Sequence, residues 1–95
     1  MPKLTRIIWK EAFIEKIESK HQVSRDEVEG VLTGRIKTYR LAKGDVRGED
    51  VYLALGRTRA GRYLAVFFIL KKDHSVLPIT ARDMDEKERG RYAHE

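Results

Sequence analysis

Cysteine is missing from this 95-residue chain, and its absence removes several kinds of chemistry. Without thiols the protein can form no disulfide, no thiolate metal site and no cysteine nucleophile. Histidine is scarce as well, and His21, His74 and His94 are too far apart in the sequence to form a metal-binding His-x-x-x-His motif. We therefore expect three surface histidines, no metal ion and no cofactor. The lack of cysteine also fits a reducing cytoplasm.

Long apolar runs are absent too. No segment approaches the roughly 18 apolar residues of a membrane span, and the few apolar residues after Met1–Arg6 are too short a stretch for a signal peptide. No serine lies in a Gly-x-Ser-x-Gly motif, and Gly56 and Gly61 are explained by the turn of a hairpin rather than by a phosphate-binding loop. We expect a soluble, unprocessed cytoplasmic protein whose residues 1–95 form one domain.

Acidic charge is scarce in the middle of the chain. The 20 basic and 15 acidic residues give a net charge of +5, in a sequence that is 37% charged. Residues 35–62 contain eight of the basic residues and three of the acidic ones, so this segment carries the whole excess. Such a cluster is either a solvated surface or a binding surface for a polyanion such as a nucleic-acid backbone.

The apolar spacing predicts an α+β fold. Residues 5–9 are β-branched and aromatic, which favours a short N-terminal strand, and residues 11–20 have the spacing of a helix. A second helix follows Ser24, which has the spacing of a capping box with Glu27. An alternating pattern then predicts three or four antiparallel strands, over residues 35–41, 51–57, 62–70 and 76–81.

The end of the predicted sheet carries two further signals. Pro78 cannot donate to a strand ladder, so its strand is either at an edge or bulged. Asp83 and Glu86 have capping-box spacing and predict a short C-terminal helix from Asp83 to about Tyr92. Two N-terminal helices, an antiparallel sheet and a short final helix are thus expected.

The remaining polar residues fit metal-free chemistry on a phosphodiester. Cleaving RNA in this way requires a base for the ribose 2′-hydroxyl, positive charge at the phosphate and an acid for the leaving oxygen. A DNA-binding helix-turn-helix is the weaker alternative, because the second helix carries Asp26, Glu27 and Glu29 against Arg25 alone.

A series of short motifs runs through almost the whole sequence. They are Trp9, Lys20-His21 with Val23, Gly48-Glu49, Tyr52-Leu53-Ala54-Leu55-Gly56-Arg57-Thr58, Gly61-Arg62-Tyr63-Leu64, Ile79-Thr80-Ala81-Arg82-Asp83-Met84, and Glu88-Arg89 with Tyr92. In this order they resemble the BrnT family, the ribonuclease toxins of a type II toxin–antitoxin system. The resemblance implies a RelE-like α+β fold and RNA cleavage without metal. It also implies a ribbon-helix-helix antitoxin partner (BrnA-like), often in a heterotetramer that represses its own operon, so that DNA is bound only through the antitoxin.

The resemblance and the residue chemistry together nominate six catalytic candidates: Lys20, His21, Glu49, Arg62, Arg82 and Tyr92. Four of them have a structural alternative. His21 can cap the first helix, Glu49 can pair with Arg47, and Tyr92 can pack in the core. Arg82 can pair with the adjacent Asp83 or with Glu86 instead of a phosphate.

Four other basic residues are predicted to bind RNA: Lys43, Arg47, Arg57 and Arg59. One position departs from the family pattern, because Val51 stands where members commonly have an arginine. This departure leaves open a second function, in which the same fold binds RNA or an antitoxin without cutting.

Overall fold

The computed structural model describes residues 6–42 and 49–93. They form three helices and four strands in the order α1 (Glu11–His21), α2 (Arg25–Leu32), β1 (Lys37–Ala42), β2 (Asp50–Arg57), β3 (Tyr63–Leu70), β4 (Val76–Asp83) and α3 (Glu86–Ala93). In the described part of the chain, no helix has the length and apolar character needed to cross a membrane. The predicted α+β class is confirmed.

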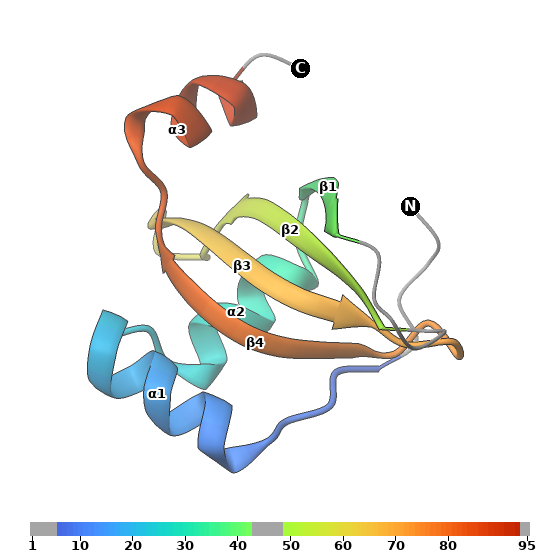
Figure 1. Cartoon of the computed structure of the whole chain (residues 1–95). Helices are drawn as coiled ribbons and strands as arrows, with labels where there is room; N and C mark the ends of the chain where they lie inside the picture. The colour runs from blue at the N-terminus through green and yellow to red at the C-terminus, as the bar shows by residue number, and fades with distance from the viewer. Residues whose placement is uncertain (1–5, 43–48, 94–95) are drawn as a thin grey trace.

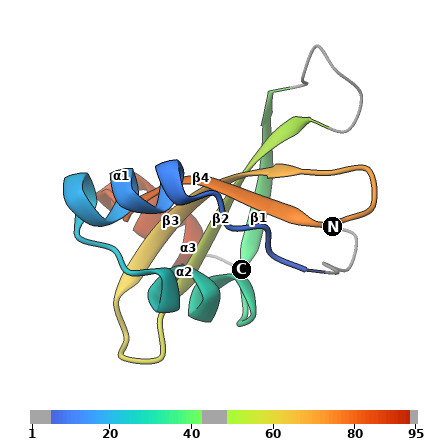
Figure 2. The same ribbon diagram turned by 90° about the horizontal axis from the view of Figure 1, so that it is seen from below.

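The four strands form one antiparallel sheet in the order β1-β2-β3-β4, so each strand pairs with its neighbour in sequence. Helix α1 packs on β4, and α2 packs on β2 and β3, while α3 contacts β2. Figures 1 and 2 show α1 and α2 together below the sheet and α3 beyond its opposite face, at one end. The sheet therefore has a helix-covered face and a second face on which α3 covers one end.

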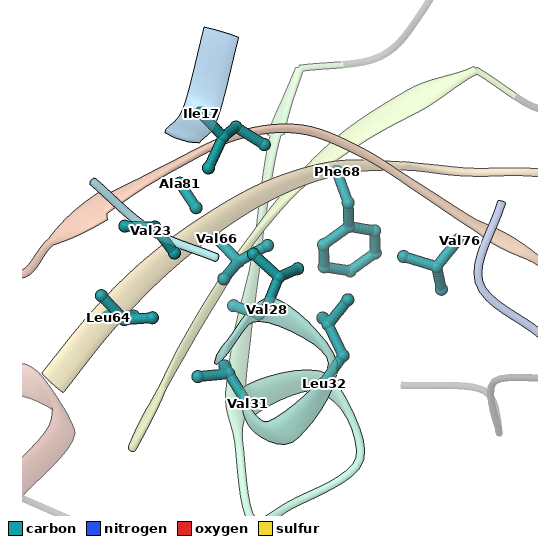
Figure 3. Close-up of a cluster of buried hydrophobic side chains, with 11 residues drawn as sticks. Ile17, Val23, Val28, Val31, Leu32, Leu64, Val66, Phe68, Val76 and Ala81 are labelled. Atoms are coloured by element: carbon teal, nitrogen blue, oxygen red, sulfur yellow. The ribbon is translucent and has the colours of Figure 1, made fainter. Parts of the chain in front are cut away.

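The main core lies between the sheet and the first two helices. Figure 3 shows Val28, Val31 and Leu32 of α2 directed at Val66 and Phe68 of β3. These five side chains are all at most 5% exposed. The apolar face predicted for α2 is the one that is buried, and its predicted capping box is formed, since Ser24 and Glu27 each accept the other's backbone N–H.

Gly56 is required by this packing. A Cβ atom at this position would lie 2.9 Å from a methyl group of Val31 and 3.0 Å from one of Ile36. The absence of a side chain lets α2 approach β2 closely. The prediction that turn geometry explains both Gly56 and Gly61 is therefore wrong for Gly56. It holds for Gly61, whose φ is +96°.

Two predictions concern the neighbourhood of β4, and only one of them is confirmed in full. The predicted N-terminal strand is reduced, in the described residues, to a single parallel bridge between Ile7 and Val76. The expectation for Pro78 is confirmed in both respects, because β4 is an edge strand and the register shifts where Phe68 pairs with Pro78.

The last helix begins later than predicted. Asp83 is still in β4, paired with Leu64 of β3, and α3 begins at Glu86. The capping box is formed by Asp85 and Glu88, which have the same spacing two residues further on. The sequence thus contains two equivalent capping-box spacings. Because Asp83 is paired in the sheet, the helix begins after the second one.

Candidate functional site

The end of β4 sends consecutive side chains to opposite faces of the sheet. Arg82 is in register with Ala65, which belongs to the apolar cluster beneath α3. Asp83 is in register with Leu64, which belongs to the core beneath α1 and α2. Because side chains alternate along a strand, Arg82 faces α3 and Asp83 faces the first two helices. Two separate polar clusters result.

The first cluster, which we call the Arg62 junction, encloses the guanidinium of Arg62. Its Nε and Nη2 donate to the two carboxylate oxygens of Asp83 at 2.7 and 3.2 Å. Its Nη1 donates to the Gln22 carbonyl at 2.9 Å and to both carboxylate oxygens of Glu27 at 3.2 Å. Nη2 also donates to the His21 carbonyl at 3.3 Å. All the N–H groups of this guanidinium thus have protein partners.

The charges at the junction stabilise one another. Hydrogen bonding to Arg62 holds the pKa of Asp83 below its usual value. The pKa of Glu27 is also lowered, first by the backbone N–H of Ser24 and then by Arg62. The pKa of Arg62 is raised, chiefly by Asp83. One cation therefore fastens the end of α1, the start of α2 and the end of β4 to the start of β3.

The second cluster lies under α3 and contains Arg82. Its Nη1 and Nη2 donate to the two oxygens of Glu88 at 2.6 and 2.8 Å, and the guanidinium lies 5.3 Å from the centre of the Phe67 ring. Glu88 is 8% exposed, and the bonds from Arg82 hold its pKa below the usual value. The same carboxylate caps α3. The predicted partners of Arg82, Asp83 and Glu86, are thus wrong, although Nη1 also donates to the Asp83 carbonyl.

Further arginines and aromatic rings alternate on the side of the sheet that faces α3. The guanidiniums of Arg57 and Arg89 both lie over the ring of Tyr63, at 4.8 and 4.2 Å from its centre. Arg91 lies 3.8 Å from the centre of the Tyr39 ring. We call this surface the arginine–aromatic face; it consists of Tyr39, Arg57, Tyr63, Phe67, Arg82, Arg89, Arg91 and Tyr92.

Tyr92 joins α3 to this face. Its ring meets Tyr63 edge to face at 6.1 Å, and its hydroxyl donates to the Arg35 carbonyl at 3.2 Å. The ring packs against the apolar cluster of Leu53 and Leu55 beneath α3. Tyr92 thus has the packing role considered for it, with its phenol at the border of the arginine–aromatic face.

The structure separates the six predicted catalytic residues into three groups. Arg82 and Tyr92 lie on the arginine–aromatic face. Lys20, His21 and Arg62 lie on the α1 side, where Lys20 is exposed and His21 contributes its carbonyl to the junction.

Glu49 precedes β2, at the opposite end of the sheet from Arg57 and Tyr63, and lies 3.7 Å from Lys71. An eight-residue strand spans roughly 26 Å, so Glu49 is remote from the other candidates.

The predicted RNA-binding residues are also divided. Arg57 is on the arginine–aromatic face. Arg59 is exposed in the β2–β3 turn and lines a pocket of about 640 Å³ with Asp26 and Glu29 of α2. Lys43 and Arg47 lie outside the described residues, so the pairing of Glu49 with Arg47 is not tested.

Val51 is in register with Ile69 of β3. It is two residues from Leu53 on the same strand, so it shares the face that bears Phe67. An arginine at this position would therefore lie on the same side of the sheet as Arg82.

Sequence reasoning missed Arg89 and Arg91 as site residues. The spacing of Asp85 and Arg89 along the sequence suits an i, i+4 ion pair, but that pair is not formed within residues 6–42 and 49–93, and Arg89 lies over Tyr63 instead. The sequence did offer a signal for them, because Arg89 and Arg91 lie close to the candidate Tyr92 on a helix that is almost wholly polar. No group of three or more His, Asp or Glu side chains in the same described ranges is arranged to hold a metal ion.

The fold and this surface define a small basic α+β protein with a cationic, aromatic sheet face of the kind that suits a polyanion. A family model described as "Ribonuclease toxin, BrnT, of type II toxin-antitoxin system" matches residues 9–88. The chain therefore belongs to the BrnT family of ribonuclease toxins.

A solved structure supports the same fold. The crystal structure of the Brucella abortus ribonuclease toxin, BrnT, is similar to this chain with a TM-score of 0.63, covering 85% of this chain and 97% of that one. The sequence identity is 23%, so the likeness is one of fold. A search of curated proteins gave no match.

Proposed function

We propose that this protein cleaves RNA without a metal ion and thereby inhibits translation and growth until an antitoxin binds it. The observation that carries this proposal is the arginine–aromatic face, on which the exposed Arg57, Arg89 and Arg91 gather positive charge beside aromatic rings. Family membership supplies the reaction class. A polyanion whose bases can stack on rings and guanidiniums is the ligand that such a surface favours.

In this proposal Arg82 stabilises the charge that develops on the scissile phosphate. Its pair with Glu88 fixes the guanidinium in one orientation, so little reorganisation is needed when a phosphate arrives. Tyr92 is proposed to supply a proton to the leaving oxygen. Lys20, His21, Glu49 and Arg62 remain proposals with weaker support, because they lie outside this face.

Several observations favour a second candidate function, binding without cleavage. The donors of Arg62 are all occupied, Arg82 is held by a carboxylate, and Glu49 is at the far end of the sheet. Because residue 51 is a valine, the side of the sheet that bears Arg82 also lacks the arginine that family members commonly carry there. A protein that holds RNA or an antitoxin on this fold would need none of these groups to be free.

The partners follow from the family rather than from any contact in this chain. We propose a cytoplasmic complex with a ribbon-helix-helix antitoxin, assembled as a heterotetramer that contacts DNA through the antitoxin. The antitoxin is expected to be encoded by the neighbouring gene.

The test is a cleavage assay with purified protein and end-labelled RNA, with and without EDTA and with and without the product of the neighbouring gene. We expect cleavage that EDTA does not change and that the partner suppresses. Arg82→Ala should reduce the rate at least about 100-fold, as for other groups that stabilise transition-state charge. Cleavage that stops in EDTA contradicts the metal-free reaction, and RNA binding without cleavage supports the second candidate.

A further inference from the structure

Cation–aromatic contacts are unusually dense in this protein. Energetically significant pairs occur about once per 70–80 residues in proteins, and among the described residues of this short chain five guanidiniums lie within the roughly 6 Å of a ring centre at which such pairs form. Four of the five are on the arginine–aromatic face, and the fifth, Arg25 over Trp9, is on the α1 side. Such a concentration on one face indicates that these residues act together as one binding surface.

Two of these arginines belong to α3, and both are exposed. Arg89 covers Tyr63 and Arg91 covers Tyr39, with Arg57 as a second cation over Tyr63. None of the three guanidiniums makes an ion pair with a carboxylate in residues 6–42 or 49–93. They differ in this respect from Arg62 and Arg82, whose charges are neutralised by Asp83 and Glu88.

A guanidinium stacked on a ring keeps its other flat surface and its charge available. Nucleobases stack on arginine planes as they do on aromatic rings, and the charge attracts the adjoining phosphates. In a duplex the bases are already stacked on one another, so their flat surfaces cannot reach such a platform. The arrangement therefore discriminates between unpaired and paired strands.

We propose that Arg89 and Arg91, held over Tyr63 and Tyr39, form a platform on which unpaired bases of RNA stack, so that this face takes single-stranded RNA. The inference rests on the proposed function in so far as RNA is the ligand. It assigns substrate binding to α3, whose arginines act here by stacking as well as by charge.

The test measures binding separately from cleavage. The probe is a fluorescently labelled 2′-O-methyl oligonucleotide of about 12 nucleotides, within the usual range of single-strand sites, used alone and annealed to its complement. Its ribose hydroxyls are blocked, so it cannot be cut by 2′-hydroxyl attack. We expect the single strand to bind at least about 10-fold more tightly than the duplex, since each stacked base contributes a factor of roughly 5 to 150.

The variants separate stacking from charge. Arg91→Gln and Arg89→Gln should each weaken binding of the single strand at least about 5-fold, with a smaller effect on the duplex. Arg91→Lys keeps the charge, the helix and the attraction to phosphate but loses the plane, so it should lose most of the preference for the single strand. Arg25→Gln is the matched control, because it removes the same charge from a ring-stacked arginine on the other side of the sheet.

Equal binding of the single strand and the duplex by the unmodified protein would overturn the inference. An Arg91→Lys variant that retains the full preference would also overturn it, and this outcome is informative even if the glutamine variants unfold. A different outcome would contradict the proposed function. If the protein binds the uncleavable single strand selectively but does not cut ordinary RNA, it is not a ribonuclease, and the inference that bases stack on Arg89 and Arg91 still holds.

Discussion

At the scale of single residues, the arginines of this protein divide by their partners. Arg62 and Arg82 are each held by a carboxylate, whereas Arg57, Arg89 and Arg91 lie over rings. A guanidinium whose donors are all bonded to protein fixes structure, and one that offers a free flat surface can take a ligand. This distinction changes the interpretation of Arg62, which the sequence suggested as a catalytic residue.

We predict that Arg62 contributes mainly to stability. Arg62→Ala leaves Asp83 and Glu27 without their cation, and the loss of charged hydrogen bonds of this kind should lower the free energy of unfolding by about 1–3 kcal/mol. The matched control is Arg40→Ala, which removes a more exposed pair with Asp50 and should cost less than about 1 kcal/mol.

Urea unfolding monitored by circular dichroism measures both variants. If Arg62→Ala is no less stable than Arg40→Ala, the junction is not a stabilising clamp, and phosphate binding becomes the better explanation of Arg62.

At the scale of elements, α3 depends on polar contacts more than on apolar burial. Glu88 is its buried residue, and this carboxylate both caps the helix and receives Arg82. Tyr92 adds an aromatic contact with Tyr63. A helix attached in this way should be sensitive to the ionisation of Glu88.

We predict that acid weakens the attachment of α3. The pKa of Glu88 is lowered in the folded protein, so its carboxylate contributes stability above the ordinary glutamate pKa of about 4.3 and loses that contribution as the pH falls below it. Glu88→Gln retains an acceptor for the cap but not the charge. Between pH 6 and pH 3 the variant should therefore lose about 1 kcal/mol less of its free energy of unfolding than the unmodified protein does.

The measurement is urea unfolding at several pH values, with the exposed Glu86→Gln as control. Glu27 and Asp83 also have lowered pKa values and contribute in the same direction, so a residual loss is expected in Glu88→Gln. An identical loss in all three proteins would contradict the role of Glu88.

The elements show which features can be predicted from sequence. The helix at Ser24 and the hairpin at Gly61 were predictable because their signals are local: a capping box, and a turn that needs positive φ. The start of α3 was not, because Asp83 and Asp85 begin equivalent capping boxes and pairing with Leu64 decides between them.

The candidate site was less predictable than the fold. Alternation along β4 places Arg82 and Asp83 on opposite faces, and a list of conspicuous cations cannot show which face each one reaches. The placement of Arg89 over Tyr63 and of Arg91 over Tyr39 depends on where α3 packs, which the sequence leaves open.

At the scale of the whole molecule, the excess charge of +5 is unevenly distributed in space as well as in sequence. Arg40 and Arg62, which belong to the basic middle segment, are paired with carboxylates. Arg57 lies on the arginine–aromatic face, where Arg89 and Arg91 from the C-terminal helix join it. The effective cationic surface is therefore built from both the middle and the end of the chain.

We predict that this surface makes RNA binding strongly dependent on salt. Each phosphate neutralised on a single strand contributes about −0.7 to the slope of log affinity against log salt concentration, so three arginines should give a slope near roughly −2. The double substitution Arg57→Gln with Arg89→Gln should make the slope shallower by about 1.4, measured by fluorescence anisotropy with the 2′-O-methyl strand between low and physiological salt.

Arg40→Gln with Arg25→Gln removes equal charge elsewhere and should leave the slope close to that of the unmodified protein. A slope near zero, or an equal change in both double variants, would mean that the charge of this face is merely solvated and that the phosphates are bound elsewhere.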